Sequence, residues 1–210
     1  MDARAIFDRV AAQFGDAVYD YKPGVVGNDK TNKGFINRDN EFKCKAERLV
    51  EVMTFLRDDA ELRMDFLMCL TGVDYIKEKL LQSVYHLFSY PLRHQICVKV
   101  DLPRDKPEVP SVVGVWITAD WNEREQYDLL GIIYTGHPDL RRLLMPDDWV
   151  GHPMRKDYKE AEMYRDMPTS RYSPLEMLSV YDKAHVQVST DPNVPGGRKA
   201  QASDSEETND

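Results

Sequence analysis

The spacing of the prolines limits where regular structure can form in this chain of 210 residues. After Tyr134 the prolines stand at positions 138, 146, 153, 168, 174, 192 and 195. Each proline removes a backbone donor and blocks the interior of a helix, so no long helix or central strand fits between them. We therefore predict a globular domain over 1–135 and an extended, partner-binding arm over 136–185.

The end of the chain has the composition of a disordered tail. Its last residues read KAQASDSEETND and contain no large apolar side chain that a core could bury. We predict a disordered acidic tail over 186–210. The chain as a whole is 42% hydrophobic, which suits one globular domain with a segment left over.

Apolar side chains recur at helical spacing in two places early in the chain. Ile6 and Val10 lie on one face of a helix predicted over 3–14, which Gly15 ends. A second amphipathic helix is predicted over 46–57. Each of these helices carries an apolar stripe that must be covered by another element.

Four segments have the pattern of β-strands. Short strands are predicted over 41–45 and 66–73. The segments LLQSVYHLFSY and HQICVKVDL, over 80–90 and 94–102, are predicted to form a hairpin because a short Pro-Leu-Arg turn separates them. Helices and strands that follow one another without regular β-α-β alternation indicate an α+β fold: a mostly antiparallel sheet packed by helices and followed by an extended C-terminal arm.

Two stretches rich in glycine or proline are predicted to be loops. Residues 22–40 are rich in Gly, Asn, Lys and Asp and show little periodicity, which predicts a long exposed loop. Residues 103–110 contain three prolines and are predicted to form a surface loop, because a central strand would need the missing backbone donors. After them, Ser111 offers a cap for a short turn that ends at Val115.

A third helix, short and strongly charged, is predicted over 121–130. Asp120 and Glu123 resemble a capping box at its start. Gly131 stands where such a helix would end in a left-handed residue.

The charges of this helix have two interpretations. Glu123, Arg124 and Glu125 could form an acid–base site in which the guanidinium tunes one carboxylate. In the simpler interpretation Arg124 and Asp128 form an ion pair at i, i+4, and Glu123 is half buried and needs an external cation. The second interpretation favours a charged helix packed against another surface.

Several classes of protein find no support in the sequence. The formal net charge is -8 with acids and bases interspersed, which argues against a protein that mainly binds nucleic acid. The chain contains no glycine-rich phosphate loop and no apolar run long enough to span a membrane. Its first residues carry charges where a signal peptide would be apolar, so we expect a cytoplasmic protein.

The cysteines do not form a recognisable ligand pattern. Cys44, Cys69 and Cys97 are widely spaced and include no Cys-x-x-Cys pair, so neither a disulfide framework nor a zinc knuckle is indicated. An iron–sulfur cluster normally takes four thiolates, which this chain cannot supply alone.

The tripeptide Gly-His-Pro occurs twice, and its histidines raise the question of a metal site. One hypothesis is a metal-dependent hydrolase in which His137 and His152 are ligands and the site is completed by Asp139, Asp147, Asp148 or Asp157. Against it, both histidines precede a proline in loop-like sequence and match no known metal spacing. Structural turns or docking contacts are the favoured interpretation.

The charges of the predicted arm are balanced. Between His137 and Arg165 there are six basic and six acidic side chains, with Trp149, Met154 and Tyr158 interleaved. Dense balanced charge around large apolar side chains is typical of a surface that another protein covers. A solvated loop is the alternative.

Three motifs of this chain together resemble a known family. They read WNEREQYDLLGI, GHPDLRRLLMPDDW and GHPMRKDY, and the likeness is densest from Trp116 to Tyr158. They resemble the C subunit of bacterial NADH:quinone oxidoreductase, respiratory complex I, which is the counterpart of the mitochondrial 30-kilodalton subunit. The order of FLMCLTGVDY and YHLFSY after Glu41 is similar to that of the family. Membrane-bound hydrogenases use a related subunit, which leaves the electron donor open.

The resemblance implies a subunit of the peripheral arm that holds no cofactor and no metal, at the cytoplasmic face of the bacterial inner (plasma) membrane. Its partners would be the D subunit and the cluster-bearing B and I subunits. FMN, iron–sulfur clusters and quinone are expected in partner subunits. This chain would support the electron route from NADH to quinone in a complex that pumps protons, without a catalytic residue of its own.

The resemblance also implies which side chains bind partners, and most of them are charged or aromatic. In this sequence they are Glu123, Arg124, Glu125, Asp128, His137, Arg141, Arg142, Asp147, Asp148, Trp149, His152, Arg155, Lys156, Asp157 and Tyr158. Met154, Leu130 and Asn122 depart from the residues that are usual at their positions, which affects local packing rather than the assignment.

Overall fold

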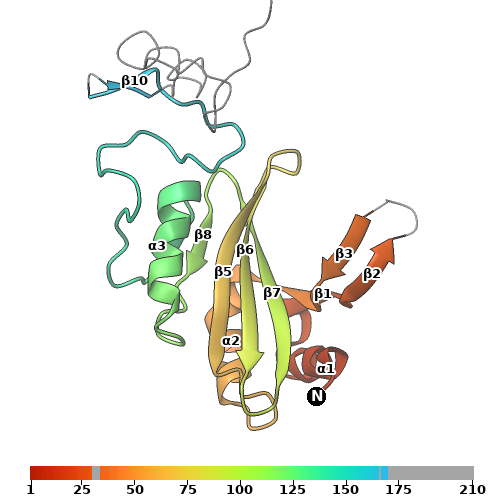
Figure 1. Ribbon diagram of the computed structural model, residues 1–210. Helices are drawn as coiled ribbons and strands as arrows, with labels where there is room; N and C mark the ends of the chain where they lie inside the picture. Colours follow the sequence, from red (N-terminus) through yellow and green to blue (C-terminus); the bar gives the residue numbers. More distant parts are fainter. Residues whose placement is uncertain (30–33, 166, 170–210) are drawn as a thin grey trace, which may run out of the picture. The chain divides into compact units, whose positions relative to one another are not determined.

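The computed structural model is shown in Figure 1 and describes residues 1–29, 34–165 and 167–169. It divides into two compact units, Met1–Lys159 and Glu160–Asp210. The first unit contains the sheet, the helices and the part of the predicted arm that precedes residue 160.

The second unit is described only for its first few residues. Two strands of two residues each, β10 (Met163–Tyr164) and β11 (Met167–Pro168), pair in antiparallel fashion there. The rest of the predicted arm, over 170–185, and the predicted acidic tail over 186–210 lie outside the described residues. The boundaries predicted for the domain, the arm and the tail stay predictions.

A five-stranded sheet forms the centre of the first unit. Its strands stand in the order β1-β4-β7-β6-β5. All neighbouring strands are antiparallel except β4 and β7, which are parallel. The predicted α+β class with a mostly antiparallel sheet is therefore confirmed. The strands are β1 (Val18–Lys22), β4 (Glu41–Cys44), β7 (His94–Pro103), β6 (Leu80–Ser89) and β5 (Phe66–Tyr75).

The two faces of the sheet differ in polarity because successive side chains of a strand point to opposite sides. Tyr85 of β6 lies opposite Leu70 of β5 and Val98 of β7, and all three side chains are buried in the core. On the other face, Lys99 of β7 lies opposite Lys43 of β4. The predicted hairpin is confirmed by the antiparallel pairing of β6 with β7.

Two helices cover the apolar face. They are α1 (Ala3–Phe14) and α2 (Leu49–Asp58), and Figure 1 shows α2 behind β5 and β6 and α1 beside β7. Ile6 of α1 and Val52 of α2 are fully buried in the core. Short 3-10 turns flank them: Gly15–Ala17 follows α1, and Ala46–Arg48 precedes α2. Among the helices that the structure describes, none is long and apolar enough to cross a membrane.

The prediction of a long exposed loop over 22–40 is wrong. Strands β2 (Val25–Asp29) and β3 (Gly34–Arg38) pair in antiparallel register, with Val25 opposite Arg38 (Figure 1). The ladder is formed by backbone hydrogen bonds, which nearly every residue type can make, so a segment without alternating apolar side chains gives no sequence signal of it.

The surface loop predicted over 103–110 is also wrong in part. Its end forms β8 (Glu108–Pro110), which pairs in parallel with β9 (Ile133–Thr135). The prolines are tolerated because Pro107 only has to accept a hydrogen bond, from the N–H of Ile133, and Pro110 ends the strand.

The third helix, α3 (Ala119–Leu130), packs against β5 where that strand has a glycine. A Cβ atom built on Gly72 would lie 2.3 Å from Leu130 Cδ1 and 2.6 Å from Gln126 Oε1. Leu130 and Gln126 are both buried, so they have little room to move away. Glycine is therefore required at this position for the helix to approach the sheet.

We expect Gly72→Ala to lower the free energy of unfolding by about 1–3 kcal/mol, because the added methyl group forces the packed helix outward. The matched control is Gly114→Ala, since nothing lies within 4 Å of a Cβ atom at that position. Denaturant unfolding of the two variants checks the prediction. Equal stability of both would show that α3 can shift freely on β5.

Candidate functional site

Most of the side chains predicted to bind partners lie on α3 or on the segment that follows β9. Figure 1 shows this segment running beside α3 after the helix has ended. We call residues 136–158 the α3-bound segment, because hydrogen bonds join it to the helix at several levels. How these residues bond decides which of them can reach another molecule.

The capping box predicted at the start of α3 is wrong. The helix begins at Ala119, and the preceding Thr118 makes no side-chain capping bond. The two predicted partners are engaged elsewhere: Asp120 Oδ1 lies 3.1 Å from His137 Nε2, and the Glu123 carboxylate bonds to the turn after β8. The predicted left-handed end at Gly131 is confirmed, with φ at 73°.

The Glu123 carboxyl group is fully buried and is satisfied by the turn at Ser111. Its Oε1 accepts the N–H of Val112 at 2.8 Å, and its Oε2 accepts the hydroxyl of Ser111 at 2.6 Å. Burial raises the pKa of Glu123 to about 7, although both hydrogen bonds act to lower it. The half-buried carboxylate that needs an external cation was therefore a wrong expectation: the group is wholly enclosed and is held by neutral donors.

The Asp128 carboxylate, also fully buried, is the strongest link between α3 and the segment. Its Oδ1 accepts a hydrogen bond from Arg142 Nη1 at 2.7 Å. Its Oδ2 accepts three successive backbone N–H groups at 2.7–3.1 Å, from Leu143, Leu144 and Met145. Burial alone would raise the pKa of Asp128, but these four donors outweigh it and hold the pKa below its ordinary value.

The i, i+4 ion pair predicted between Arg124 and Asp128 is wrong. Asp128 pairs with Arg142, whereas Arg124 turns towards the start of the segment. There its Nε donates to the carbonyl oxygen of Arg141 at 3.4 Å, and its Nη1 lies 3.9 Å from Asp139 Oδ2. Both charged groups of α3 are thus used to hold the segment rather than each other.

The C-terminal end of α3 receives a second set of bonds from the segment. The carbonyl oxygens of residues 128–130 accept hydrogen bonds from His152 Nδ1 at 3.0 Å, Met154 N at 3.0 Å and Arg155 Nε at 2.6 Å. These carbonyls have no partners within the helix, so the segment supplies donors that the helix itself lacks. Gly131 makes room for them, since a Cβ there would lie 2.5 Å from His152 and 2.9 Å from Arg155.

The surroundings of His152 favour the neutral form of its imidazole at this end of the helix. Burial lowers the pKa of the imidazole, and the nearby guanidinium groups of Arg155 and Arg142 lower it further. Because a carbonyl oxygen can only accept, the proton of the neutral ring is on Nδ1. The predicted structural turn at the second Gly-His-Pro is consistent with this bonding.

The last part of the segment is bonded to the sheet. Arg104, just after β7, bridges Asp74 of β5 (Nη2–Oδ2, 2.9 Å) and Asp157 of the segment (Nη2–Oδ1, 2.5 Å). The backbone N–H of Lys156 donates to the same Asp74 at 2.9 Å. Tyr158 closes the segment, since its hydroxyl accepts the indole N–H of Trp149 at 3.1 Å.

The two histidines of the repeated tripeptide are kept apart by the length of α3. The His137 imidazole contacts the backbone oxygen and the carboxylate of Asp120 in the first turn of α3. The His152 imidazole bonds to the backbone oxygen of Asp128 near the end of the helix. Eight residues of helix separate these positions by about 12 Å. The two imidazoles therefore cannot bind one metal ion, and no group of three or more His, Cys, Asp or Glu in the described ranges is arranged to hold one.

The remaining predicted site residues lie on the surface of the segment and helix. Arg141 pairs with Asp139 at 2.9 Å, and both side chains are exposed. Glu125 on α3 is half-buried, and Asp147 and Asp148 are exposed. These are the charged groups that a partner could contact directly.

Sequence reasoning missed Asp74, Arg104 and Ser111. Each of them bonds to a predicted site residue that lies far away in the sequence. Asp74 lies in the motif FLMCLTGVDY, and Ser111 was expected only to cap a short turn, so the local context of neither residue indicated the distant group to which it bonds.

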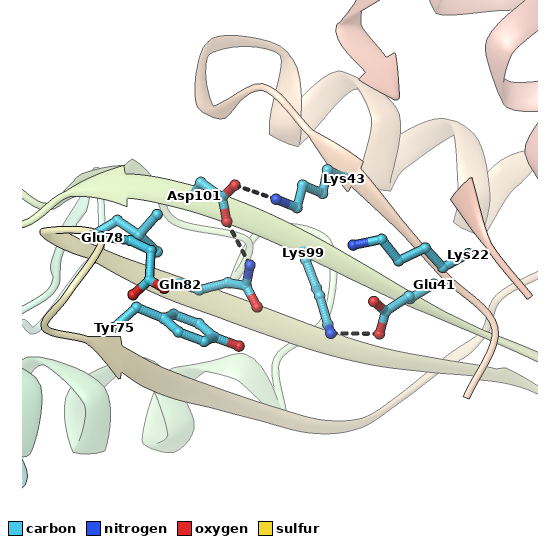
Figure 2. Close-up of a pocket in the computed structure, with 9 residues that line it drawn as sticks. Lys22, Glu41, Lys43, Tyr75, Glu78, Gln82, Lys99 and Asp101 are labelled. Carbon is cyan, nitrogen blue, oxygen red and sulfur yellow. Dashed lines mark hydrogen bonds and ion pairs between the residues drawn. The ribbon is translucent and has the colours of Figure 1, made fainter. Parts of the chain in front are cut away.

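A second candidate site is a hollow of about 250 Å³ on the polar face of the sheet, drawn in Figure 2. It is lined by three basic and three acidic side chains, four of which pair with one another: Lys43 bonds to Asp101 at 2.7 Å, and Lys99 bonds to Glu41 at 2.5 Å. Gln82 donates to the same Asp101 at 2.5 Å. The hollow therefore presents no unbalanced charge that would select a ligand.

Comparison with known proteins gives a family match. The family model described as the 30 Kd subunit of respiratory-chain NADH dehydrogenase matches residues 42–164. This range includes β4 from its second residue, the whole of β5, β6, β7 and α3, and the whole α3-bound segment.

Two similar relatives are named as the C subunit of NADH-quinone oxidoreductase. The one from Chlorobium phaeobacteroides is 42% identical over 163 residues, which cover 77% of this chain and 92% of the relative. The one from Roseiflexus sp. is 54% identical over 114 residues, which cover 54% of this chain and 66% of the relative. The chain thus spans just under two thirds of the Roseiflexus relative.

Two solved structures are similar to this chain. A trypsin-resistant fragment of Nqo5 is 27% identical, has a TM-score of 0.53, and is matched over 67% of this chain and 100% of the fragment. A chain of the membrane-bound sulfane sulfur reductase, an archaeal respiratory membrane complex, has a TM-score of 0.57 over 91% of this chain and 98% of that chain. The second is 20% identical, so it indicates a shared fold only.

We expect Asp128→Asn to lower the free energy of unfolding by about 3 kcal/mol, because Arg142 and the N–H groups would lose a buried charged acceptor. The matched control is Asp139→Asn, which breaks an exposed pair and should change stability little. Denaturant unfolding and amide exchange at Leu143 and Leu144 check the prediction. Unchanged exchange in Asp128→Asn would show that other contacts hold the segment.

We also expect Glu123 to make the protein less stable as the pH rises. The folded state binds the proton of Glu123 more tightly than the unfolded chain, with a pKa of about 7 against an ordinary 4.5. The free energy of unfolding should therefore fall between about pH 4.5 and pH 7. In Glu123→Gln the free energy of unfolding should fall less over this pH range than it does in the unchanged protein. Asp120 and His137 are present in both proteins, so the difference between the two pH profiles reports Glu123. Urea unfolding at pH 5 and pH 7.5 checks it, and identical pH profiles would refute it.

Proposed function

This chain belongs to the family of the 30-kilodalton subunit of respiratory-chain NADH dehydrogenase, and we propose that it is the C subunit of a proton-translocating NADH:quinone oxidoreductase, complex I. The observation that carries the proposal is the extent of the family match. Residues 42–164 include four of the five strands of the sheet, β4 from its second residue, together with the α3-bound segment, so the likeness is not limited to a common fold. The identity of 42% to a relative covered over 92% of its length supports the same assignment.

The role of the chain in the complex is to dock on other subunits of the peripheral arm. The proposed partners are the D subunit, with the cluster-bearing B and I subunits nearby. The α3-bound segment supports this role because its buried charges hold its backbone on α3, as at Asp128 and Arg142. Buried members of the predicted partner-binding set position the segment, and exposed members such as Arg141 and Asp147 contact the partner.

The chain is proposed to support electron transfer from NADH to quinone without a redox group of its own. Cys44 and Cys97 are buried, and burial raises the pKa of each thiol to about 12. Metal and cluster ligands are thiolates, so two of the three cysteines are poorly suited to bind a cluster. FMN, iron–sulfur clusters and quinone are accordingly assigned to partner subunits.

The proposed location is the cytoplasmic face of the bacterial inner membrane, where the chain is held through the complex. The named relatives from Chlorobium and Roseiflexus support a bacterial respiratory complex. The chain would be a peripheral subunit there.

Gentle solubilisation of host membranes tests the proposed function. We expect the chain to elute with NADH:quinone reductase activity and with a D-type subunit, in a stoichiometric complex. Elution only as a free monomer would contradict the proposal. Elution with a quinone-reducing or hydrogen-evolving complex that does not oxidise NADH would keep the docking role and refute the assignment of the electron donor.

A further inference from the structure

Three large apolar side chains of the α3-bound segment are exposed. They are Leu144, Val150 and Met154, with exposed fractions of 61%, 85% and 62%. Exposure of this size is costly for apolar groups in water and favours their burial against another surface. We call these three residues the apolar anchors.

The backbone around each anchor is fixed to the same end of α3. The N–H of Leu144 donates to Asp128 Oδ2, and the N–H of Met154 donates to the carbonyl oxygen of Leu129. Val150 lies between two residues whose carbonyl oxygens both accept hydrogen bonds from Arg142 Nη2, at 3.0 Å and 3.2 Å. A surface presented on fixed backbone loses little conformational entropy when it is buried, which favours tight association.

The charged groups beside the anchors are largely engaged within the chain. Arg142 pairs with buried Asp128, Asp157 pairs with Arg104, and Arg155 Nε donates to the carbonyl oxygen of Leu130. Groups that are bonded in this way contribute little further attraction to a partner. Arg141 and Asp147 are exposed and can add polar contacts at the rim, while the apolar anchors supply apolar area that a partner can bury.

The charge balance of the region selects the kind of partner. Over 137–165 there are six basic and six acidic side chains, so the region has no positive excess. Binding to an anionic membrane surface or to a phosphate backbone depends on an excess of Lys and Arg. An apolar surface with a balanced charged rim is instead the composition of a protein–protein interface.

We propose that the apolar anchors Leu144, Val150 and Met154 insert into an apolar groove of a neighbouring protein subunit and are the main docking contacts of this chain. This inference rests on the proposed function, because it assumes that the chain assembles into a respiratory complex. It changes the expected chemistry of docking: the charged side chains of the segment hold the backbone in place, and the apolar ones bind the partner.

The test compares two matched double variants of the full-length chain. The first, Leu144→Ser/Met154→Ser, removes two anchors. The second, Leu92→Ser/Met68→Ser, removes exposed residues of the same types, at 39% and 51% exposure, from a turn and a strand away from the segment. Thermal unfolding should be close to that of the unchanged protein in both, since all four side chains are exposed.

Binding is measured on membranes from host cells that lack this chain but keep the other subunits. Purified chain is titrated onto them, and both bound protein and recovered NADH:quinone reductase activity are recorded. We expect the anchor variant to bind at least about tenfold more weakly than the unchanged chain, and the control variant to differ by less than about twofold. Protein-free vesicles of phosphatidylethanolamine and phosphatidylglycerol should bind none of the three chains.

Each contrary result has a distinct meaning. Failure of the unchanged chain to bind the membranes or restore activity would overturn the proposed function, and the inference with it. If the unchanged chain binds and the anchor variant binds with equal affinity, the inference alone is overturned. The same holds if the anchor variant and the control variant lose affinity equally. If the chain binds the vesicles and the anchor variant does not, the ligand of the anchors is lipid, and the inference of a protein partner is overturned. Anchor-dependent self-association in light scattering would replace it by a second copy of the chain.

Discussion

The buried carboxylate of Asp128 is the interaction on which the arrangement of the site depends. A carboxylate removed from water must be matched by donors inside the protein, because an unmatched buried charge is very costly. Here the donors are the guanidinium of Arg142 and the backbone N–H groups of residues 143–145. One side chain of α3 therefore fixes the direction of the chain after β9, and His152 and Arg155 then return to the end of the same helix.

This arrangement separates two tasks that the sequence mixes in one segment. Polar and charged groups of α3 and of the segment hold the backbone in place through bonds to each other, to the sheet and to the turn at Ser111, and Glu123 and Asp128 are fully buried among them. Leu144, Val150 and Met154 are directed to solvent at the same level of the helix. A docking surface gains from such a division, because rigid backbone lowers the entropy lost on binding while exposed apolar area supplies the favourable free energy.

Local patterns predicted the elements that depend on local forces. The helix over 3–14, the β6–β7 hairpin and the left-handed Gly131 follow from periodicity and from turn chemistry, and all three are confirmed. The β2–β3 ladder and the pairing of β8 with β9 were not predicted, because residues 22–40 have no clear apolar pattern and the prolines of residues 103–110 favoured a loop. The capping box failed because its residues are compatible with a cap but have better partners in three dimensions.

The sequence by itself determined the class of the fold, the lack of a long helix or strand among the described residues after Thr135, the balance of charge over 137–165 and the resemblance to a family. These properties depend on composition, spacing and order along the chain. Only the tertiary structure decided that Asp128 pairs with Arg142 rather than with Arg124, and that His137 and His152 lie at opposite ends of one helix. The physical reason is that a buried charge is paired by whichever donors the path of the chain brings to it, and sequence spacing shows only the neighbours within one turn of a helix.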